Sequence, residues 1–333
     1  MSETQRTFDR KTKPRGSLGV LEELAVRIGA LQQVAVPVTP ECAIVVAAAD
    51  HGVAAEGVSA YPPEVTAQMV ANFVAGGAAI NVLTREVGAR LVVVDAGVVT
   101  PSAPGVVRSL RFGAGTASIT EGPAMERETA VRAVDAGTAL ARELVGDGIG
   151  LIGVGEMGIG NTTAASALCA ALLPADPPEV CGRGTGLDDE GLARKVAAVG
   201  RALEVNRVDP SDPLGVLAAL GGFEIALLVG VILGCRAERV PVVLDGFITG
   251  AAALVAARLE PAAVEAMIAA HRSPEPGHAL LLDELGLEPL LDLRLRLGEG
   301  TGAALALPIV RGALALLNEM ASFDEAGVTD AGR

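Results

Sequence analysis

Residues 150–163 read GLIGVGEMGIGNTT, an apolar run followed by a glycine-rich turn and the start of a helical pattern. A short apolar run rich in Ile and Val that ends at such a turn is typical of a buried strand. The free N–H groups and the dipole at the start of the following helix would suit a phosphate group. The segment therefore predicts a strand, a turn and a helix, with an anion site at the turn.

Further runs rich in Val and Ile lie on both sides of this segment, at residues 43–49, 90–94 and 240–244. Together with 149–154 they alternate with helical patterns, which is typical of parallel strands joined by crossover helices. Each run leads to a small or acidic residue and then a loop, as at Asp50-His51-Gly52. Because ligands of open α/β sheets bind beyond the carboxyl ends of the strands, these ends are expected to outline the site.

The helical patterns cover residues 18–32, 63–74, 125–145, 161–173, 188–206, 223–233 and 301–321. The first and the last of them flank all the strand patterns. These two terminal helices are candidates for a small second unit packed from both ends of the chain.

Composition limits the class of protein. Half of the residues are apolar, only 2% are aromatic and tryptophan is absent, so Ala, Val, Leu and Ile must fill a layered α/β core. The formal net charge of −14 argues against nucleic acid or an anionic membrane surface as a partner. It does not argue against a small anionic ligand held by a few local N–H groups and basic side chains.

No metal or disulfide framework is expected. The four cysteines are far apart and form no C-x-x-C pair, so reduced, mostly buried thiols are the expectation. The three histidines lack the i, i+4 spacing of a helical zinc site. Because the first fifteen residues are polar and lack an apolar segment, we expect a cytoplasmic protein.

Residues 214–235 form an apolar stretch long enough to resemble a membrane span. Glu224 lies in its middle, and five glycines interrupt it. A carboxylate at the centre of a bilayer is costly, whereas a helix covered on all sides by protein is just as apolar. We therefore expect a buried helix, in the core or at a dimer seam, and no membrane span.

Gly153, Gly155 and Gly158 satisfy the G-x-G-x-x-G pattern of dinucleotide-binding proteins. That pattern needs a second strand ending in an acidic residue about 20 positions later, and no Val/Ile run precedes Asp176. A G-x-S-x-G elbow and a complete Walker A loop are also absent. Dinucleotide oxidoreductases, serine hydrolases and P-loop kinases are therefore not expected.

A second glycine-rich turn, GRGTG at residues 182–186, leads into the acidic helix start 188–190. Either turn alone could merely permit a tight change of direction. Two such turns, with Arg183 and Lys195 close in sequence to the second, could hold one phosphorylated ribose from two sides. We therefore favour a phosphoribose site.

Glu299 lies between glycines in LRLGEGTG at residues 295–302, just before an apolar helix. A carboxylate there can be an ordinary first-turn charge. It can also be a base held in a partly dry cleft, because the flanking glycines permit close approach of a ligand. The local pattern leaves both interpretations open.

Five blocks in order resemble the nicotinate-nucleotide:dimethylbenzimidazole phosphoribosyltransferases. They are ADHGV at 49–53, GEMGIGNTT at 155–163, GRGTG at 182–186, HRSPEPGH at 271–278 and GEGTG at 298–302, and the likeness extends from KPRGSLG at 13–19 to ASF at 321–323. The resemblance implies a doubly wound, mostly parallel α/β domain over residues 41–299. It also implies a smaller helical domain made of residues 1–40 and about 300–333, and a homodimer.

The resemblance further implies a transfer of phosphoribose from nicotinate mononucleotide to dimethylbenzimidazole that needs no metal and no cofactor. Glu299 corresponds to the catalytic base, which would take the ring proton of the acceptor while inversion gives an α-riboside. Glu156 would steady positive charge on the ribose and Lys195 would act at the phosphate. On the local pattern alone, Lys195 could equally be a solvated helix residue.

Binding residues follow from the same correspondence. Phosphoribose is expected on Gly158, Gly160, Asn161, Thr162, Gly184, Thr185, Gly186, Ser273 and Arg296. The aromatic base is expected near Ser59, Tyr61, Gln68, Met157 and Leu297. Tyr61 and Met157 could equally be core or hinge residues.

Two other functions remain open. The first is an enzyme of the same scaffold that uses another acceptor, such as adenine or a phenolic ring. The second is a nucleotide-binding or regulatory dimer that keeps the phosphate turns but catalyses nothing.

Overall fold

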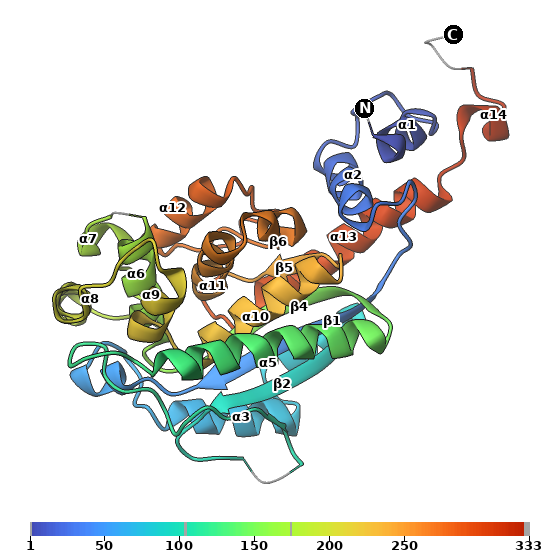
Figure 1. Cartoon of the computed structure of the whole chain (residues 1–333). Helices are drawn as coiled ribbons and strands as arrows, with labels where there is room; N and C mark the ends of the chain where they lie inside the picture. The colour runs from blue at the N-terminus through green and yellow to red at the C-terminus, as the bar shows by residue number, and fades with distance from the viewer. Residues whose placement is uncertain (1, 103–104, 174, 330–333) are drawn as a thin grey trace.

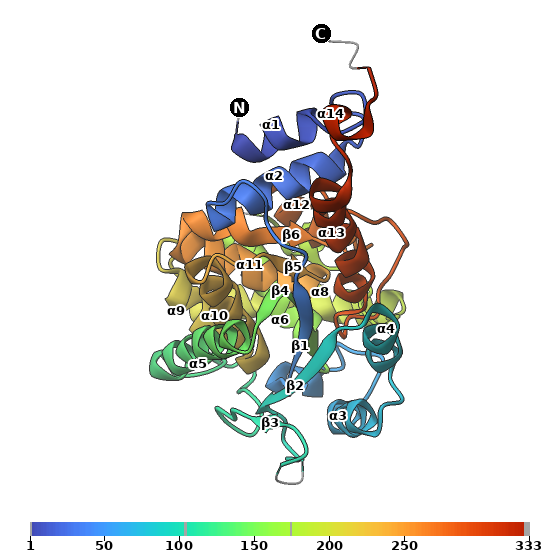
Figure 2. The same cartoon turned by 90° about the vertical axis from the view of Figure 1, so that its right-hand side faces the viewer.

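A parallel sheet forms the centre of the computed structural model, which describes residues 2–102, 105–173 and 175–329. Its six strands lie in the order β3-β2-β1-β4-β5-β6, and all pairs are parallel. The strands are β1 (Glu41–Ala49), β2 (Arg90–Gly97), β3 (Arg108–Ser109), β4 (Ile149–Met157), β5 (Val242–Leu244) and β6 (Met267–Ala269). Helices cover both faces (Figures 1 and 2). The predicted parallel α/β class is thereby confirmed.

Strand β1 shows why the sheet is buried on both sides. Residues 42–49 are all buried, and alternate side chains enter two different apolar clusters. Ala43, Val45 and Ala47 pack toward one face, whereas Ile44 and Val46 pack toward the other. Because β1 pairs with β2 on one side and β4 on the other, the strand order reverses here, and ligands of such sheets bind beyond the carboxyl ends.

The face that contains Ala43, Val45 and Ala47 is covered by a group of apolar helices. They are α5 (Arg127–Gly146), α6 (Asn161–Leu172), α9 (Pro213–Leu220), α10 (Phe223–Ala237) and α11 (Phe247–Leu259), with α7 (Pro177–Val180), α8 (Asp189–Asn206) and α12 (Pro276–Leu285) farther out. Helices α5 and α10 touch through glycines, because a Cβ on Gly230 would lie against the carbonyl oxygen of Val134. This close approach explains glycines in the apolar stretch 214–235.

The opposite face carries α3 (Val65–Ala75), α4 (Ala79–Val87) and α13 (Thr301–Glu319), with α2 (Val20–Gln32) and α1 (Glu3–Asp9) beyond them. Two short 3-10 segments, Gly52–Glu56 and Pro261–Ala266, complete the loops. The terminal helices α1, α2 and α14 (Phe323–Ala326) gather around the far end of α13 (Figure 1). There the Lys11 side chain donates a hydrogen bond to the Met320 carbonyl at 2.6 Å.

The division into two domains stays a prediction. Phe8 and Ile28 of the terminal helices share one apolar cluster with Ile44 of β1 and Leu307 of α13, so the core continues from one part to the other. Residues 330–333 of the predicted small domain lie outside the described residues.

The apolar stretch 214–235 is buried, as expected, but it forms two helices, α9 and α10, and not one. Among the described residues, two other helical stretches are long and apolar enough to cross a membrane, Val65–Val87 and Thr301–Glu319. The first consists of α3 and α4, and the second packs its first half against the sheet. Buried helices of water-soluble proteins share these properties.

The sequence patterns do not predict several elements. Strand β3 has only two residues, and β6 continues an Ala-rich sequence that lacks the Val-rich signal of β5. Helices α4, α11 and α12 are not predicted either. Gly155 and Glu156 belong to β4 and not to the loop after it, so the Glu156 side chain is fixed by the sheet itself.

Candidate active site

A pocket lies beyond the carboxyl ends of β4, β5 and β6. Its walls come from the end of β4 and the start of α6, from the turn before α8, from the loops after β5 and β6, and from the segment before α13. The lining residues are Glu156, Met157, Gly158, Ile159, Asn161, Thr162, Gly184, Thr185, Asp245, Gly246, Phe247, Ile248, His271, Ser273, Glu275, Leu295, Arg296, Leu297 and Gly298.

Most of the predicted phosphoribose residues converge on this pocket. Gly158, Asn161, Thr162, Gly184, Thr185, Ser273 and Arg296 line it, together with Glu156, Met157 and Leu297. Gly160, Gly186, Lys195, Glu299, Ser59, Tyr61 and Gln68 are not among its lining residues. Two of these, Lys195 and Glu299, are buried directly behind its walls.

Glu156 is a buried carboxyl group at the end of β4, only 6% exposed. Asn161 in the first turn of α6 donates a hydrogen bond to its Oε2. Burial raises the pKa of Glu156 to about 8, and the nearby carboxylates of Asp245, Glu224 and Glu299 act in the same direction. At neutral pH this side chain is therefore mostly protonated in the ligand-free protein.

Glu299 sits in a left-handed backbone conformation, with φ of 62° between Gly298 and Gly300. Its amide donates to the Glu156 carbonyl at 3.2 Å, and its Oε2 accepts from the Ile80 amide at the start of α4 at 3.4 Å. Burial raises the pKa of Glu299, as does Asp245, whereas the Ile80 N–H lowers it. The turn presses so closely on β4 that a Cβ on Gly155 would overlap the backbone of Gly300.

Lys195 and Glu275 form the other buried charged group. Lys195 is fully buried on α8, where its Nζ donates to the Gly182 carbonyl at 3.1 Å and lies 3.8 Å from Glu275 Oε2. Burial lowers the pKa of Lys195, and the charge of Glu275 opposes that shift. Lys195 therefore supports the Gly182–Gly184 turn from behind, and the pocket is lined by the turn itself.

Some of the N–H groups expected to hold phosphate have partners within the chain. Glu275 Oε1 accepts from the Gly184 amide at 2.8 Å, and the Gly186 amide donates to the Arg183 carbonyl at 2.9 Å. The Ser273 amide donates to Nδ1 of His278, whose pKa burial lowers to about 3. A neutral His278 thus orients the loop that carries Ser273 and Glu275.

The predicted base-binding residues are divided between the pocket and a neighbouring surface. Tyr61 and Leu297 are 52% and 57% exposed, whereas Met157 packs against the small apolar cluster of Ala48, Val70 and Val98. Ser59 and Tyr61 precede α3, and Gln68 lies within it. This helix contacts the pocket wall where the Ile159 amide donates to Thr66 Oγ1 at 3.1 Å. The structure therefore connects this segment to the pocket through Thr66, while Ser59, Tyr61 and Gln68 stay outside its lining.

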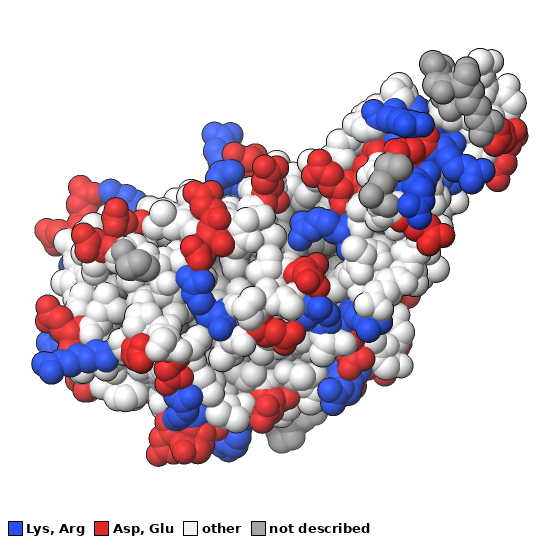
Figure 3. All heavy atoms as spheres, turned by 45° about the horizontal axis from the view of Figure 1, so that its top comes forward, with Lys and Arg blue, Asp and Glu red and all other residues white. Residues whose placement is uncertain are grey.

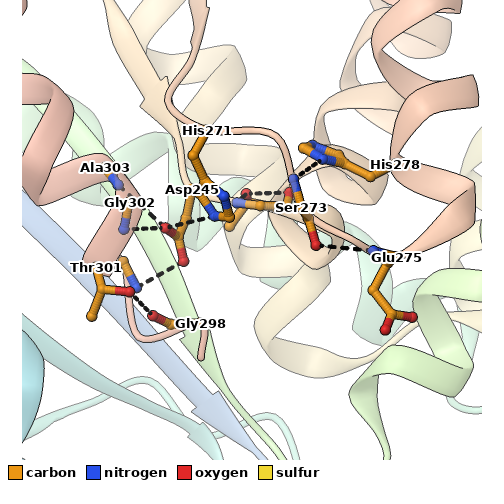
Figure 4. Close-up of polar contacts among 12 residues, drawn as sticks. Asp245, His271, Ser273, Glu275, His278, Gly298, Thr301, Gly302 and Ala303 are labelled. Carbon is orange, nitrogen blue, oxygen red and sulfur yellow. Dashed lines mark hydrogen bonds and ion pairs between the residues drawn. The ribbon is translucent and has the colours of Figure 1, made fainter. Parts of the chain in front are cut away.

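Several buried groups at the site are not among the residues predicted to act there. Asp245 follows β5 and accepts hydrogen bonds from the start of α13, and His271 Nε2 lies 3.8 Å from it (Figure 4). His51 Nε2 lies 2.7 Å from Glu224 Oε1, with both side chains almost completely buried. Their positions at strand ends, and the carboxylate within an apolar run, were the available signals.

Comparisons with known proteins show the family of the chain. The family model described as "Phosphoribosyltransferase" matches residues 1–328. The chain belongs to this family. It is 56% identical over 328 residues to the nicotinate-nucleotide–dimethylbenzimidazole phosphoribosyltransferase of Chloroflexus aurantiacus, covering 98% of this chain and 93% of that one.

A Desulforamulus reducens protein of the same name is 52% identical over 332 residues, which cover 99% of this chain and 94% of the relative. The crystal structure of CobT from Thermus thermophilus superposes with a TM-score of 0.94 at 49% identity, covering 99% of this chain and 98% of that one. The resemblance inferred from the five sequence blocks is thus confirmed, and this phosphoribosyltransferase is a glycosyl-transferring enzyme.

Proposed function

We propose that this phosphoribosyltransferase moves phosphoribose from nicotinate mononucleotide to dimethylbenzimidazole and releases nicotinate. The names of its relatives support these substrates. The observation that carries the proposal is a single pocket in which the buried carboxyl group of Glu156 adjoins two glycine-rich turns, at Gly158 and Gly184. Such turns bind phosphate, and Glu156, once the cationic substrate has displaced its proton, stabilises positive charge on the ribose ring as a fixed carboxylate.

In the proposed reaction the C–N bond from the ribose to the pyridinium ring breaks, and a bond from the ribose to a benzimidazole nitrogen forms. The pyridinium nitrogen takes the bonding electrons, so its ring becomes neutral without needing an acid. The acceptor must lose the proton on its other nitrogen, and Glu299 takes it. Attack opposite to the leaving group inverts the anomeric carbon and gives the α-riboside.

The position and proton affinity of Glu299 suit a base. The residue is 3% exposed, and its raised pKa makes it a better proton acceptor than a solvated glutamate. Its backbone is hydrogen-bonded to Glu156, which brings the base and the ribose-stabilising carboxyl group to neighbouring positions.

The remaining site residues hold the substrates. Phosphoribose lies against Gly158, Gly160, Asn161, Thr162, Gly184, Thr185, Gly186, Ser273 and Arg296, and the phosphate replaces Glu275 as the acceptor at the Gly184 amide. Lys195 acts through the turn that it supports. The aromatic ring lies near Ser59, Tyr61, Gln68, Met157 and Leu297.

We also propose that the enzyme is a cytoplasmic homodimer that needs no metal or cofactor. An apolar groove on α2 and α13 supports self-association, because Leu21, Ile309, Leu316 and Met320 line it and are only partly buried. Figure 3 shows acidic and basic side chains interspersed on the face it draws, which offers no broad basic surface for nucleic acid. Sedimentation of the purified protein tests the dimer.

The reaction is tested by incubating the protein with nicotinate mononucleotide and dimethylbenzimidazole, without added metal and with a chelator. We expect chromatography to show nicotinate release that depends on the acceptor, and proton magnetic resonance to show an α-riboside phosphate. Adenine and a phenol, added separately, test the alternative acceptors. Nucleotide binding without turnover on any acceptor would instead support a non-catalytic role.

A further inference from the structure

Asp245 caps a helix that is distant from it in sequence. Its Oδ1 accepts from the amides of Gly302 at 2.7 Å and Ala303 at 3.2 Å, and its Oδ2 accepts from the amide of Gly300 at 3.1 Å (Figure 4). The first N–H groups of a helix lack partners within the helix, and a side chain at the N-cap normally satisfies one of them. The N-cap of α13 is Gly300, which has no side chain, so Asp245 supplies the carboxylate instead.

The residues held in this way include the turn that carries Glu299. Gly298, Glu299 and Gly300 all adopt positive φ angles, of 81°, 62° and 82°. A non-glycine residue in this region is strained and persists only where its surroundings fix it. The turn is held from β4 through the Glu299 amide and from the end of β5 through Asp245.

Asp245 also adds a negative charge to a buried cluster of ionisable side chains. Glu156 from β4 and Glu299 from the turn are the carboxyl groups that face it, Glu224 from α10 acts on Glu156, and His271 after β6 is the titratable base beside it. Asp245 is 2% exposed, so water screens these interactions weakly. Like charges at such sites favour protonation of their neighbours.

We propose that Asp245 is a positioning residue for the transfer reaction, because its carboxylate holds the Gly298–Gly300 turn that presents the base. This inference rests on the proposed function. The charge of Asp245 has a second effect, since it strengthens Glu299 as a proton acceptor. Its two contributions, geometry and charge, can be separated by two substitutions.

Asp245→Asn keeps the shape of the side chain but loses the charge and one of its two accepting oxygens. We expect kcat to fall about tenfold or more. We also expect the acidic limb of kcat/KM against pH to move to lower pH, because Glu299 loses a neighbouring negative charge. A purely structural role would lower activity with the folded fraction and leave the limb in place.

Asp245→Glu keeps the charge but moves the carboxylate away from the three amides. We expect kcat to fall by a similar factor, with the acidic limb within a few tenths of a pH unit of the wild type. If Asp245→Asn does not fold, this variant carries the test alone, and a wild-type kcat would overturn the proposal.

Asp95→Asn is the matched control. Asp95 is also buried in a strand end, where it accepts from the Val98 amide at 2.9 Å and pairs with Arg111, but it does not line the pocket. We expect a lower melting temperature and an unchanged acidic limb. An Asp245→Asn enzyme with the kcat and the limb of the wild type would refute the positioning role, whereas an inactive wild type would refute the proposed function itself.

Discussion

The pocket has two buried sides, one with a cluster of carboxyl groups and one with an ion pair. The carboxylate side, made of Glu156, Asp245 and Glu299, gathers acidic groups with raised pKa values. The phosphate side pairs Lys195 with Glu275 and hydrogen-bonds both of them to the turn at Gly182–Gly184. Burial is similar on the two sides, so the difference lies in the partners that each group finds.

One pocket can thus contain both a carboxyl group that is protonated near neutral pH and a site for an anion. On the carboxylate side, like charges and burial act together, so a group there can accept a proton near neutral pH. On the phosphate side, the buried cation is already compensated, and the carboxylate that compensates it occupies an N–H group suited to phosphate. In the proposed complex the phosphate takes this N–H group, so Glu275 must release it when substrate binds.

Breaking the phosphate side should have the largest effect on stability. Lys195→Met leaves the Glu275 carboxylate buried without its cation, so we expect a loss of about 3–5 kcal/mol in the free energy of unfolding. Urea denaturation measures it. Adding Glu275→Gln should restore part of the loss, and Arg194→Met, which removes an exposed cation on the same helix, should change stability by less than about 0.5 kcal/mol.

Replacing Glu156 by an uncharged residue should change how the stability of the fold depends on pH. A carboxyl group whose pKa is raised in the folded state stabilises the fold fully below its unfolded value, and loses that contribution as pH rises to about 8. Between pH 6 and pH 9 we expect the free energy of unfolding of the wild type to fall by roughly 3 kcal/mol relative to that of Glu156→Gln. Denaturation at several pH values tests this, and parallel curves for the two proteins would contradict it.

Removing the base tests the chemistry of the carboxylate side. We expect Glu299→Gln to fold and to bind nicotinate mononucleotide, while kcat falls at least about a hundredfold, equivalent to about 2.7 kcal/mol. Glu319→Gln, an exposed change at the far end of α13, the helix that follows Glu299, serves as the control. Turnover close to that of the wild type would remove Glu299 as the base.

A smaller effect is expected at the loop that joins the two sides. Ser273→Ala removes the hydroxyl that accepts from the Glu275 amide at 3.3 Å. We expect stability to fall by about 1 kcal/mol and KM for nicotinate mononucleotide to rise a few-fold, with kcat nearly unchanged. A large fall in kcat at constant KM would place Ser273 in the chemical step instead.

The main strands and the glycine-rich turns could be predicted because their signals are local. Buried parallel strands are continuous Val, Ile and Ala runs, and the turn at Gly158–Gly160 follows one of them directly. β6 could not be predicted, because Met267–Ala269 has one β-branched residue and continues the Ala-rich sequence before it, unlike the Val-rich run of β5. The resemblance to a family supplied the site residues that single motifs left open.

The partners of the buried charges were beyond the sequence. Asp245 and Gly300 are separated by 55 positions, and nothing local indicates that one caps the other. The pairing of Lys195 with Glu275 has the same character, since one residue is on α8 and the other precedes α12. Only the packing of the sheet brings these groups together.

On the carboxylate side, Glu156 is expected to hold a proton at neutral pH. Infrared difference spectroscopy between the ligand-free wild type and Glu156→Gln at pH 7 measures this directly. We expect the carbonyl stretch of a protonated carboxyl group in the wild type, lost in the variant and fading as pH rises past 8. A wild-type spectrum showing only an ionised carboxylate at that position would contradict the account.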